Sequence, residues 1–301
     1  LISNGNKLSK MDGFSKISTS NVATLAISTV MVAAAHPLTY VKVLIQVGYE
    51  PIPPHRVTTL FGKTVYRLPN VLEYAGHIKA VDGWFGLYRG LGARIAHNIV
   101  NSSVRNSISN TLTEQEKDKS KVSEKSLQTF LKEVGNEAVA KSAGLFVSYP
   151  LQLISIRMMV QFVGRETEYR SLFSSFKEIY KEEGILGFFS GIVPHLLGEL
   201  FLLWLCKSMN FCVQKYIISE EYSQIPEVRS YTHSISQYIA SIVTYPFTLV
   251  TNIMAINDSK LVAGNPPLTP IYHSWTDCWI DLGKKGLRSR GSTLFRRNVS
   301  I

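Results

Sequence analysis

Two long stretches without charged side chains constrain the fold of this chain more than any other feature of its sequence. Residues 22–41 contain no Asp, Glu, Lys or Arg over 20 positions, and residues 230–257 contain none over 28. A bilayer core about 30 Å thick is crossed by roughly 20 helical residues. Both stretches are therefore long enough to span a membrane, although the mean hydropathy of the whole chain is only +0.07.

Three further segments have a mixed character. Residues 142–156 are uncharged and extend on both sides in helical periodicity, whereas residues 192–218 are strongly apolar but include Glu199 and Lys207. Both patterns fit a membrane span, and both also fit a buried helix of a soluble protein. Hydropathy alone does not identify residues 90–112 as a span, because this segment contains Arg94, His97, Asn98, Asn101 and Arg105.

The charge and the composition exclude several classes of function. The formal net charge of +10 suits an anionic partner, either nucleic acid or a membrane surface. The sequence has no block of Lys and Arg with interleaved aromatic residues, which argues against nucleic acid. Three cysteines at odd spacing predict neither a disulfide framework nor a zinc site, and seven scattered histidines show no metal-ligand spacing. We find no catalytic constellation and expect no enzymatic activity, no metal and no cofactor.

Self-similarity divides the chain into three degenerate repeats. Three prolines, 113 and 96 residues apart, each lie late in an apolar segment. The first two prolines are followed by an acid-Gly pair, four residues, an aromatic residue, one residue and a glycine. The third copy, at 285–291, is shorter and lacks the aromatic residue. The signature positions are Pro37, Asp82, Gly83, Gly90, Pro150, Glu183, Gly184, Gly191 and Pro246.

These motifs resemble the signature of the mitochondrial carrier family, in which Pro-x-acid-x-x-base is followed by acid-Gly-x4-aromatic-base-Gly. The resemblance implies three two-helix repeats, with kinked odd-numbered helices and short helices parallel to the membrane between them. We therefore expect an all-α membrane protein with a degenerate carrier fold and short amphipathic surface helices. Its expected parts are a mobile N-terminal segment (1–20), repeat 1 (21–112), a charged linker (113–129), repeat 2 (130–218) and an incomplete repeat 3 (230–301).

Two departures from the family pattern bear on function. In carriers, an acid and a base after each proline form a ring of salt bridges that closes one end of the pathway. Here the six ring positions are Thr39, Lys42, Gln152, Ser155, Thr248 and Thr251, so that one charge remains. A ring without opposite charges does not form such a gate, which disfavours a metabolite antiporter. Ten residues follow Gly291, about 15 Å of helix, so we also expect the sixth transmembrane helix to be missing and the bundle to be open on one side.

An open bundle is expected to present polar side chains, and residues three or four apart supply a polar stripe on each helix. An intramembrane charge is costly unless it is paired or hydrated, which makes it a pointer to function. Structural interpretations remain open: hydroxyls can bond to their own helix, and Glu137 can pair with Lys141 at i,i+4. Lys42 can pair with Glu199, and Lys207 can reach the end of its helix. The polar groove is predicted to be lined by Lys42, Arg94, Asn98, Gln152, Arg157, His195, Glu199 and Thr248.

Several segments resemble the mitochondrial carrier homolog proteins, a divergent branch of the family, and the second member of that branch most: 40–54, 159–166, 182–189, 244–247 and 270–279. The resemblance implies a multi-pass protein of the outer mitochondrial membrane that inserts α-helical clients, tail-anchored and signal-anchored ones among them. It also implies docking of a pro-apoptotic BH3 protein. We expect an insertase with a groove open to lipid, with membrane-protein clients and membrane lipids as partners and no nucleic acid. A receptor or scaffold for the BH3 protein is the alternative, and a solute carrier fits the incomplete ring less well.

Overall fold

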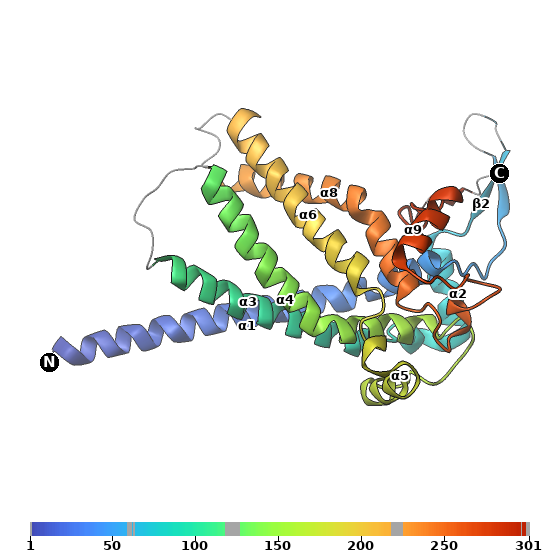
Figure 1. Cartoon of the computed structure of the whole chain (residues 1–301), viewed down its shortest axis with the longest axis horizontal. Coiled ribbons are helices and arrows are strands. Elements are labelled where there is room, and N and C mark those ends of the chain that lie inside the picture. The colour runs from blue at the N-terminus through green and yellow to red at the C-terminus, as the bar shows by residue number, and fades with distance from the viewer. Residues whose placement is uncertain are drawn as a thin grey trace.

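The computed structural model describes residues 2–58, 62, 64–117, 127–217, 225–295 and 297–298, and the side chains of these residues from Ala23 onward except those of 114–117, 127, 217 and 298. Most of the described chain is helical, which confirms the expected all-α architecture. The long helices converge at one end of the molecule and splay apart toward the other (Figure 1). They are α1 (Ile2–Val47), α3 (Leu91–Lys117), α4 (Leu127–Val160), α6 (Ile192–Cys212) and α8 (Pro226–Met254), and η1 (Val213–Ile217) continues α6.

Hydropathy and length together identify three membrane spans among the described residues: Ala23–Val47, Gln128–Val160 and Ile192–Tyr216. The helices α3 and α8 are 27 and 29 residues long, which also suffices to cross a bilayer. Their polar side chains keep their mean hydropathy low, as predicted for residues 90–112. The uncharged stretch at 230–257 falls largely within α8, where frequent Ser and Thr lower the hydropathy that the absence of charge suggested.

Shorter helices lie at the end where the long helices converge (Figure 1). They are α2 (Val71–Gly86), α5 (Leu172–Gly187), η2 (Val262–Gly264) and α9 (Trp275–Lys284). The side chains of Asn70, Ser171 and Ser274 cap α2, α5 and α9 by accepting hydrogen bonds from backbone N–H groups. Large apolar side chains such as Phe85 and Phe173 are exposed on α2 and α5. These helices therefore match the expected amphipathic surface helices.

One hydrogen bond recurs at the same signature positions of all three repeats. The residue before each proline donates to the carbonyl of the residue before the signature glycine. The pairs are His36 Nε2 to Arg89 O at 2.9 Å, Tyr149 Oη to Ser190 O at 2.6 Å and Tyr245 Oη to Arg290 O at 2.6 Å. The three glycines that follow have φ of 78–82°, a conformation that glycine adopts without a steric penalty.

These glycines also join each repeat to the next, which closes a ring at the convergent end. A Cβ on Gly90 would lie 2.8 Å from Ser155 O of α4, and one on Gly191 would lie 2.9 Å from Thr251 O of α8. The third glycine, Gly291, approaches Gln46 of α1 in the same way, at 3.1 Å. Such close contacts exclude any side chain at the first two positions. The third repeat therefore packs on the first even though its signature is the most degenerate.

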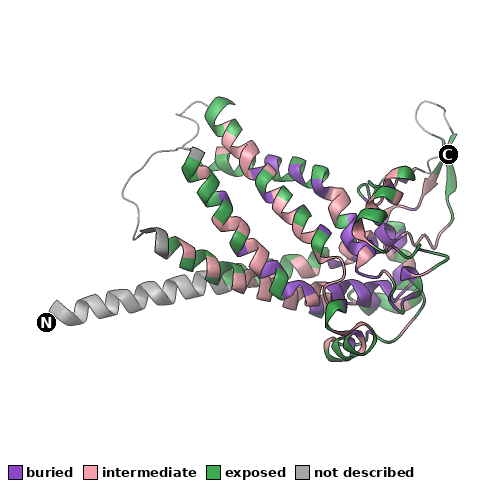
Figure 2. Ribbon diagram, viewed as in Figure 1, coloured by how far each residue is buried: buried purple, intermediate pink, exposed green. Residues whose placement is uncertain are grey.

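Burial is concentrated at this closed end, whereas the splayed ends of the helices are largely exposed or half-buried (Figure 2). The main core cluster contains Tyr40–Val47 of α1 except Lys42 and Gln46, apolar residues of the last third of α4, and Ala255, Ile256, Leu261 and Ala263. Among its largest members are Tyr40, Leu44, Tyr149 and Leu153, all 0% exposed. The helices are therefore tightly packed at the closed end and loosely packed toward the other end.

The C-terminal residues depart from the expected arrangement. Arg297–Asn298 form strand β3, which pairs antiparallel with β2 (Thr64–Leu68), and β2 pairs with β1 (His55–Thr58). The sequence did not predict this small sheet. The described residues after Gly291 run back to repeat 1 and form no sixth helix. At the other end, residues 2–20 are continuous with α1. The predicted linker at 113–129 overlaps the end of α3 and the start of α4, and its residues 118–126 lie outside the described part of the chain.

Candidate functional site

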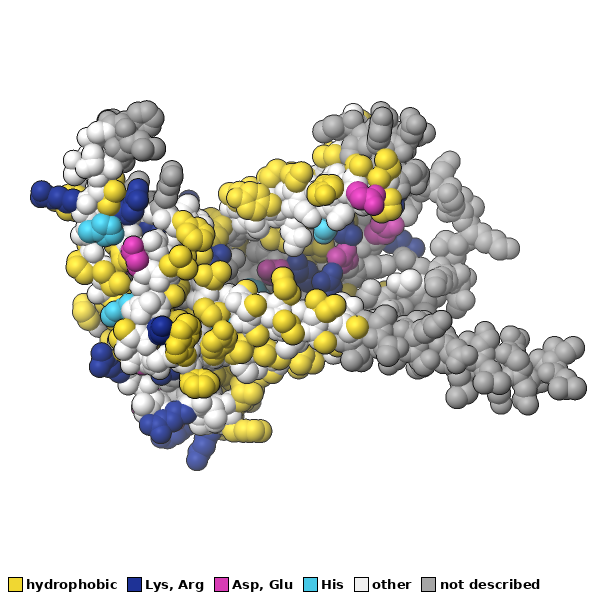
Figure 3. Space-filling model, turned by 180° about the vertical axis from the view of Figure 1, so that it is seen from behind, with side chains coloured by type: hydrophobic (Ala, Val, Ile, Leu, Met, Phe, Trp, Pro, Cys, Tyr) yellow, Lys and Arg dark blue, Asp and Glu magenta, His cyan; other side chains and the backbone are white. Residues whose placement is uncertain are grey.

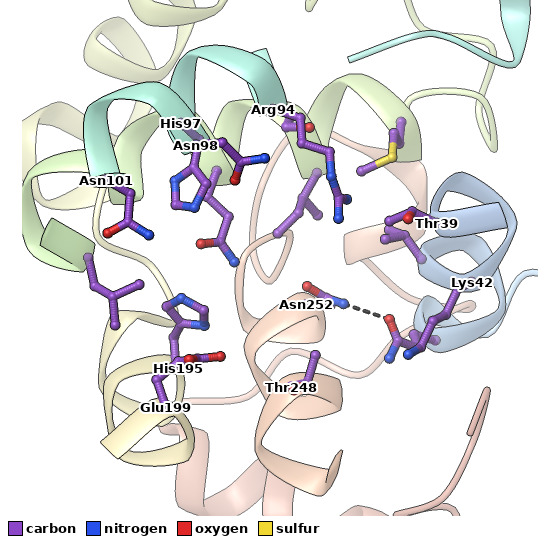
Figure 4. Close-up of a pocket in the computed structure, with 17 residues that line it drawn as sticks. Thr39, Lys42, Arg94, His97, Asn98, Asn101, His195, Glu199, Thr248 and Asn252 are labelled. Atoms are coloured by element: carbon purple, nitrogen blue, oxygen red, sulfur yellow. Dashed lines mark hydrogen bonds between the residues drawn. The ribbon is translucent and has the colours of Figure 1, made fainter. Parts of the chain in front are cut away.

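A cavity of about 360 Å³ lies between the long helices just above the closed end. Figure 3 shows this hollow from behind, with charged side chains inside it and hydrophobic side chains on the outer helix surfaces. Side chains from α1, α3, α6 and α8 point into a shared space (Figure 4). Seven of the eight predicted groove residues line the cavity. Its polar lining residues are Thr39, Lys42, Gln46, Arg94, His97, Asn98, Asn101, Gln152, Ser155, His195, Glu199, Thr248 and Asn252.

Two cations on one side of the cavity have no carboxylate partner among the described residues. Lys42 of α1 lies with Nζ 5.1 Å from the centroid of the Tyr245 ring, a cation–π contact that leaves its charge uncompensated. Arg94 of α3 lines the same cavity and forms no ion pair within the described chain. The pairing of Lys42 with Glu199 that the sequence left open is therefore not formed. Two cations without counter-ions give this side of the groove a positive field.

The opposite side of the groove contains ion pairs between helices. Glu199 of α6 binds Lys141 of α4 at 2.8 Å, and Lys141 Nζ also donates to the Glu199 carbonyl at 3.2 Å. Glu137 binds Arg105 of α3 at 2.8 Å and Lys207 of α6 at 2.7 Å. The proposed pairing of Glu137 with Lys141 within α4 was wrong. Each residue instead takes its partner from a neighbouring helix, because those helices present opposite charges at the same height.

Three polar atoms of lining residues are buried without a hydrogen-bond partner in the described chain. These are Gln152 Oε1, Asn101 Oδ1 and His195 Nε2, and Asn101 Oδ1 lies against Gly144 of α4. His97 bonds through Nδ1 to Ser148 O at 3.0 Å, and the ring centroids of His195 and Tyr149 lie 5.5 Å apart. A buried polar atom without a partner costs about 1–3 kcal/mol, so these three atoms reduce the stability of the bundle.

The six ring positions carry no ion pair within the described residues. Thr39 donates to Ala35 O, and Thr251 donates to Phe247 O, each within its own helix. Ser155 donates instead to Gly90 O across the repeat junction at 3.0 Å. The polar link between α1 and α8 lies deeper, where Asn252 Nδ2 donates to Gln46 Oε1 at 2.6 Å (Figure 4). The residues that form an electrostatic gate in carriers are thus engaged in fixed hydrogen bonds or face the cavity uncharged, Lys42 excepted.

Arg157 does not line the groove, so its assignment as a groove residue was wrong. Its side chain is 0% exposed in the core at the closed end. The guanidinium forms two bonds to Glu183, one of them 2.9 Å long, and donates to Ala255 O at 2.9 Å and Tyr169 Oη at 3.3 Å. The end of α4 does line the cavity, through Gln152, Ser155, Ile156 and Met159, but Arg157 lies on a different face of this helix. Arg157 joins repeat 2 to the end of α8.

Sequence reasoning missed three polar residues that line the groove. His97 was noted only as an obstacle to a hydropathic span, although it follows Arg94 by three residues and so lies near the same face. Gln46 and Asn252 lie in apolar stretches and follow Lys42 and Thr248 by one turn. That spacing is the signal that could have identified them.

Comparison with known proteins identifies relatives of this chain. The family model described as mitochondrial carrier protein matches residues 15–118 and 127–217. The chain is 43% identical over 272 residues to "Mitochondrial carrier homolog 2" of Homo sapiens, covering 88% of this chain and 90% of that protein. It is 38% identical to "Mitochondrial carrier homolog 1" of Mus musculus, covering 94% and 78%. It is 24% identical to "Probable mitochondrial 2-oxoglutarate/malate carrier protein" of Dictyostelium discoideum, covering 89% and 78%.

Proposed function

This chain belongs to the mitochondrial carrier family, and on that premise we propose that it inserts α-helical proteins into the outer mitochondrial membrane through its polar groove. Tail-anchored and signal-anchored proteins are the proposed clients. The similarity to carrier homologs makes the chain a mitochondrial membrane protein of carrier type. The observation that carries the proposal is a groove that contains two cations without carboxylate partners in the described chain, Lys42 and Arg94, on helices that also expose apolar side chains.

The outer surfaces beside the groove suit the apolar part of a client. Ile27, Val30 and Met31 are exposed on α1, and Ile235 and Ile242 are exposed on α8. Between these two helices the described residues form contacts near the closed end, whereas their other ends splay apart (Figure 1). A client helix can therefore reach lipid sideways while its polar terminus remains within the groove.

The groove would lower the barrier to insertion by replacing hydrocarbon with polar groups along the path. Each polar group carried into hydrocarbon without a partner costs several kcal/mol. The side chains of Lys42, Arg94 and Asn98 line the groove and can donate hydrogen bonds to water or to a client terminus. Burial of the apolar client helix at roughly 25 cal/mol per Å² supplies the driving force. The proposed mechanism needs no nucleotide.

The field of the groove predicts which variants change insertion. Lys42, Arg94 and Lys141 outnumber the carboxylate of Glu199, so the groove is net positive. At an effective dielectric constant of about 20, a unit charge about 10 Å away changes the energy of a client charge by about 1–2 kcal/mol. Glu199→Arg is therefore expected to slow insertion of a client with a basic tail roughly tenfold or more. Lys42→Glu is expected to accelerate it by a similar factor.

The test uses purified protein in liposomes and a labelled tail-anchored client, with insertion measured as the protease-protected fragment. Arg56→Glu, on strand β1 and outside the groove, is the matched control for a change in charge. Glu199→Gln separates loss of the bond to Lys141 from the added positive charge. The groove mechanism fails if Glu199→Arg and Lys42→Glu both insert the client at the wild-type rate.

The same variants address a receptor role. We propose, as the alternative, that a pro-apoptotic BH3 protein docks on this chain at the mitochondrial surface, as the resemblance implies. A receptor that uses exposed loops would retain its partner in both groove variants. Loss of insertion with unchanged capture of a BH3 protein would assign the groove to insertion and the docking to another surface.

A further inference from the structure

A thiol, an imidazole and an amide meet between α6 and α8, outside the groove. These two helices run side by side (Figure 1). Cys206, in the second half of α6, lies with Sγ 3.9 Å from Nδ1 of His233, in the first third of α8. Asn210 follows Cys206 by one helical turn, and its Nδ2 lies 3.0 Å from His233 Nδ1 and 3.7 Å from Cys206 Sγ. The three side chains therefore surround one point between the two helices.

Thiolate sulfur and imidazole nitrogen are ligands that zinc prefers in proteins. The described residues contain no cluster of three His, Cys, Asp or Glu side chains, so a third protein ligand at this point has to be the amide oxygen of Asn210. In the structure Nδ2 of this amide faces the thiol and the imidazole, whereas Oδ1 is buried and has no hydrogen-bond partner in the described chain. No hydrogen bond to Oδ1 therefore opposes a half-turn of the amide, which would bring the oxygen to the place that Nδ2 now takes.

The separations between these three groups fit a tetrahedral metal ion. Bonds of about 2.3 Å to sulfur, about 2.0 Å to nitrogen and about 2.1 Å to oxygen place the ligand atoms of a tetrahedral zinc site about 3.3–3.6 Å apart. The observed separations are 3.9, 3.7 and 3.0 Å, each within about 0.4 Å of that range. Small side-chain movements would therefore bring all three atoms to bonding distance of one ion.

The exposure of the cluster suits a small ion rather than a larger reactant. Cys206 is buried at 4% exposure, whereas His233 is exposed. An ion can approach from the His233 side, but a bulky electrophile does not reach the sulfur, which argues against a catalytic nucleophile. Nδ2 of an amide only donates hydrogen bonds, so His233 Nδ1 accepts the one from Asn210 and directs its lone pair into the cluster. The imidazole is thus in the form that binds a metal.

We propose that Cys206, Asn210 and His233 bind a zinc ion, with a water molecule as the fourth ligand. Binding releases the proton of the Cys206 thiol to solvent, because the thiolate is the ligand. Closed structural sites have four protein ligands, so a site with three and a water is open and its ion exchangeable. The bound ion would link α8, which borders the groove, to α6.

The sequence did not predict this site because its two strong ligands are 27 residues apart and on different helices. Only the packing of α6 against α8 brings them together. The site goes beyond client insertion and stands whether or not the groove inserts proteins.

The test uses the purified full chain in detergent, without a polyhistidine tag, and Co²⁺ and Zn²⁺ as the probes. A thiolate ligand gives bound Co²⁺ a sulfur-to-metal charge-transfer band in the near ultraviolet. We expect one Co²⁺ per chain with this band, and loss of the band when Zn²⁺ displaces it. Cys206→Ser should abolish the band, and Cys206→Ser and His233→Gln should each weaken zinc binding by about a hundredfold or more, since loss of an outer-shell partner alone costs about 10–100-fold.

Asn210→Asp is the variant that tests the third ligand. A carboxylate oxygen is an ordinary zinc ligand, so this substitution should tighten zinc binding about tenfold or more, by analogy with the effect of outer-shell partners. A merely structural role of the amide predicts no such gain.

Two substitutions serve as matched controls. Cys212→Ser removes the exposed thiol at the end of α6, and His55→Gln removes an exposed imidazole of β1; both variants should bind Co²⁺ and Zn²⁺ as the wild type does. Zinc should raise the melting temperature of the wild type and leave that of Cys206→Ser unchanged, and melts without metal check that each variant is folded.

The site is overturned if the wild type shows no charge-transfer band, or if Cys206→Ser retains it. A band that disappears in Cys212→Ser would overturn it too, because the metal would then be held by the exposed thiol. Unchanged zinc affinity of Asn210→Asp would overturn the assignment of the third ligand. Client insertion is not a readout here, so the two proposals fail separately.

Discussion

Replacing Glu183 by Gln should destabilise this protein more than any other change to a signature acid. Glu183, which is 21% exposed, is the carboxylate partner of Arg157, whose side chain is 0% exposed, so the buried charge of this pair is that of the arginine. Gln retains the shape of the side chain but leaves the guanidinium charge without compensation. Breaking a buried ion pair by removing one partner costs about 3–5 kcal/mol. At about 2 °C per kcal/mol for a chain of this size, the melting temperature should fall by roughly 6–10 °C.

Repeat 1 provides the matched control. Asp82 occupies the same signature position, but it pairs with Arg89, and the two side chains are 22% and 30% exposed. A partly exposed pair contributes about 0–1 kcal/mol. Asp82→Asn should therefore lower the melting temperature by no more than about 2 °C.

The measurement is thermal unfolding of both variants in the same detergent, followed by intrinsic fluorescence. Replacing Arg157 and Glu183 together by Met should recover most of the loss, because an apolar pair leaves no buried charge uncompensated. The reasoning is refuted if Glu183→Gln and Asp82→Asn melt within 1 °C of each other. It is also refuted if the double Met variant is less stable than Glu183→Gln.

Two further predictions concern Cys278 and Asp281, two side chains of α9. Burial raises the pKa of the Cys278 thiol to about 12. Maleimide at pH 7.5 should therefore label exposed Cys212 and leave Cys278 unmodified until the protein is denatured in detergent. Peptide mass mapping would identify the labelled cysteine. Hydrogen bonds from Lys285 and Tyr272 lower the pKa of Asp281. The contribution of the Asp281 carboxylate to the free energy of unfolding is therefore present above the unfolded pKa of about 4 and is lost as pH falls through the folded pKa. Asp281→Asn should thus reduce stability at pH 7 by about 0.5–1 kcal/mol and make no difference near pH 2, in melts recorded at both pH values.

The helical repeats could be predicted from the sequence because their signals are local. A proline that fixes the backbone and a glycine at positive φ act wherever they occur, and their spacing located the repeats. The recurrent hydrogen bond from His36, Tyr149 and Tyr245 could have been suspected from their shared place before each proline. Strand β3 could not, because its pairing with β2 joins segments more than 200 residues apart.

The positions of groove residues were predictable, whereas their partners were not. Helical spacing placed seven of eight candidates around one cavity, since periodicity alone determines the face of a helix. The partner of Glu137 depends on which helix lies opposite and at what height. For this reason Lys207 and Arg105, rather than Lys141, bind it. Arg157 was misplaced because its side of α4 faces Glu183 and Ala255, whereas Ser155, Ile156 and Met159 of the same turns line the cavity.

Closure of the base depends on backbone groups, whereas the groove is lined by side chains. The base is closed by backbone carbonyls and glycines, and in repeat 3 this involves Arg290, which donates to the Gln46 carbonyl of α1 at 3.0 Å. Gln46 and Ser155 take part in both, because each also lines the groove. Substitution of a lining side chain that makes no closing contact, such as Lys42 or Arg94, should therefore change the charge of the groove without loosening the base.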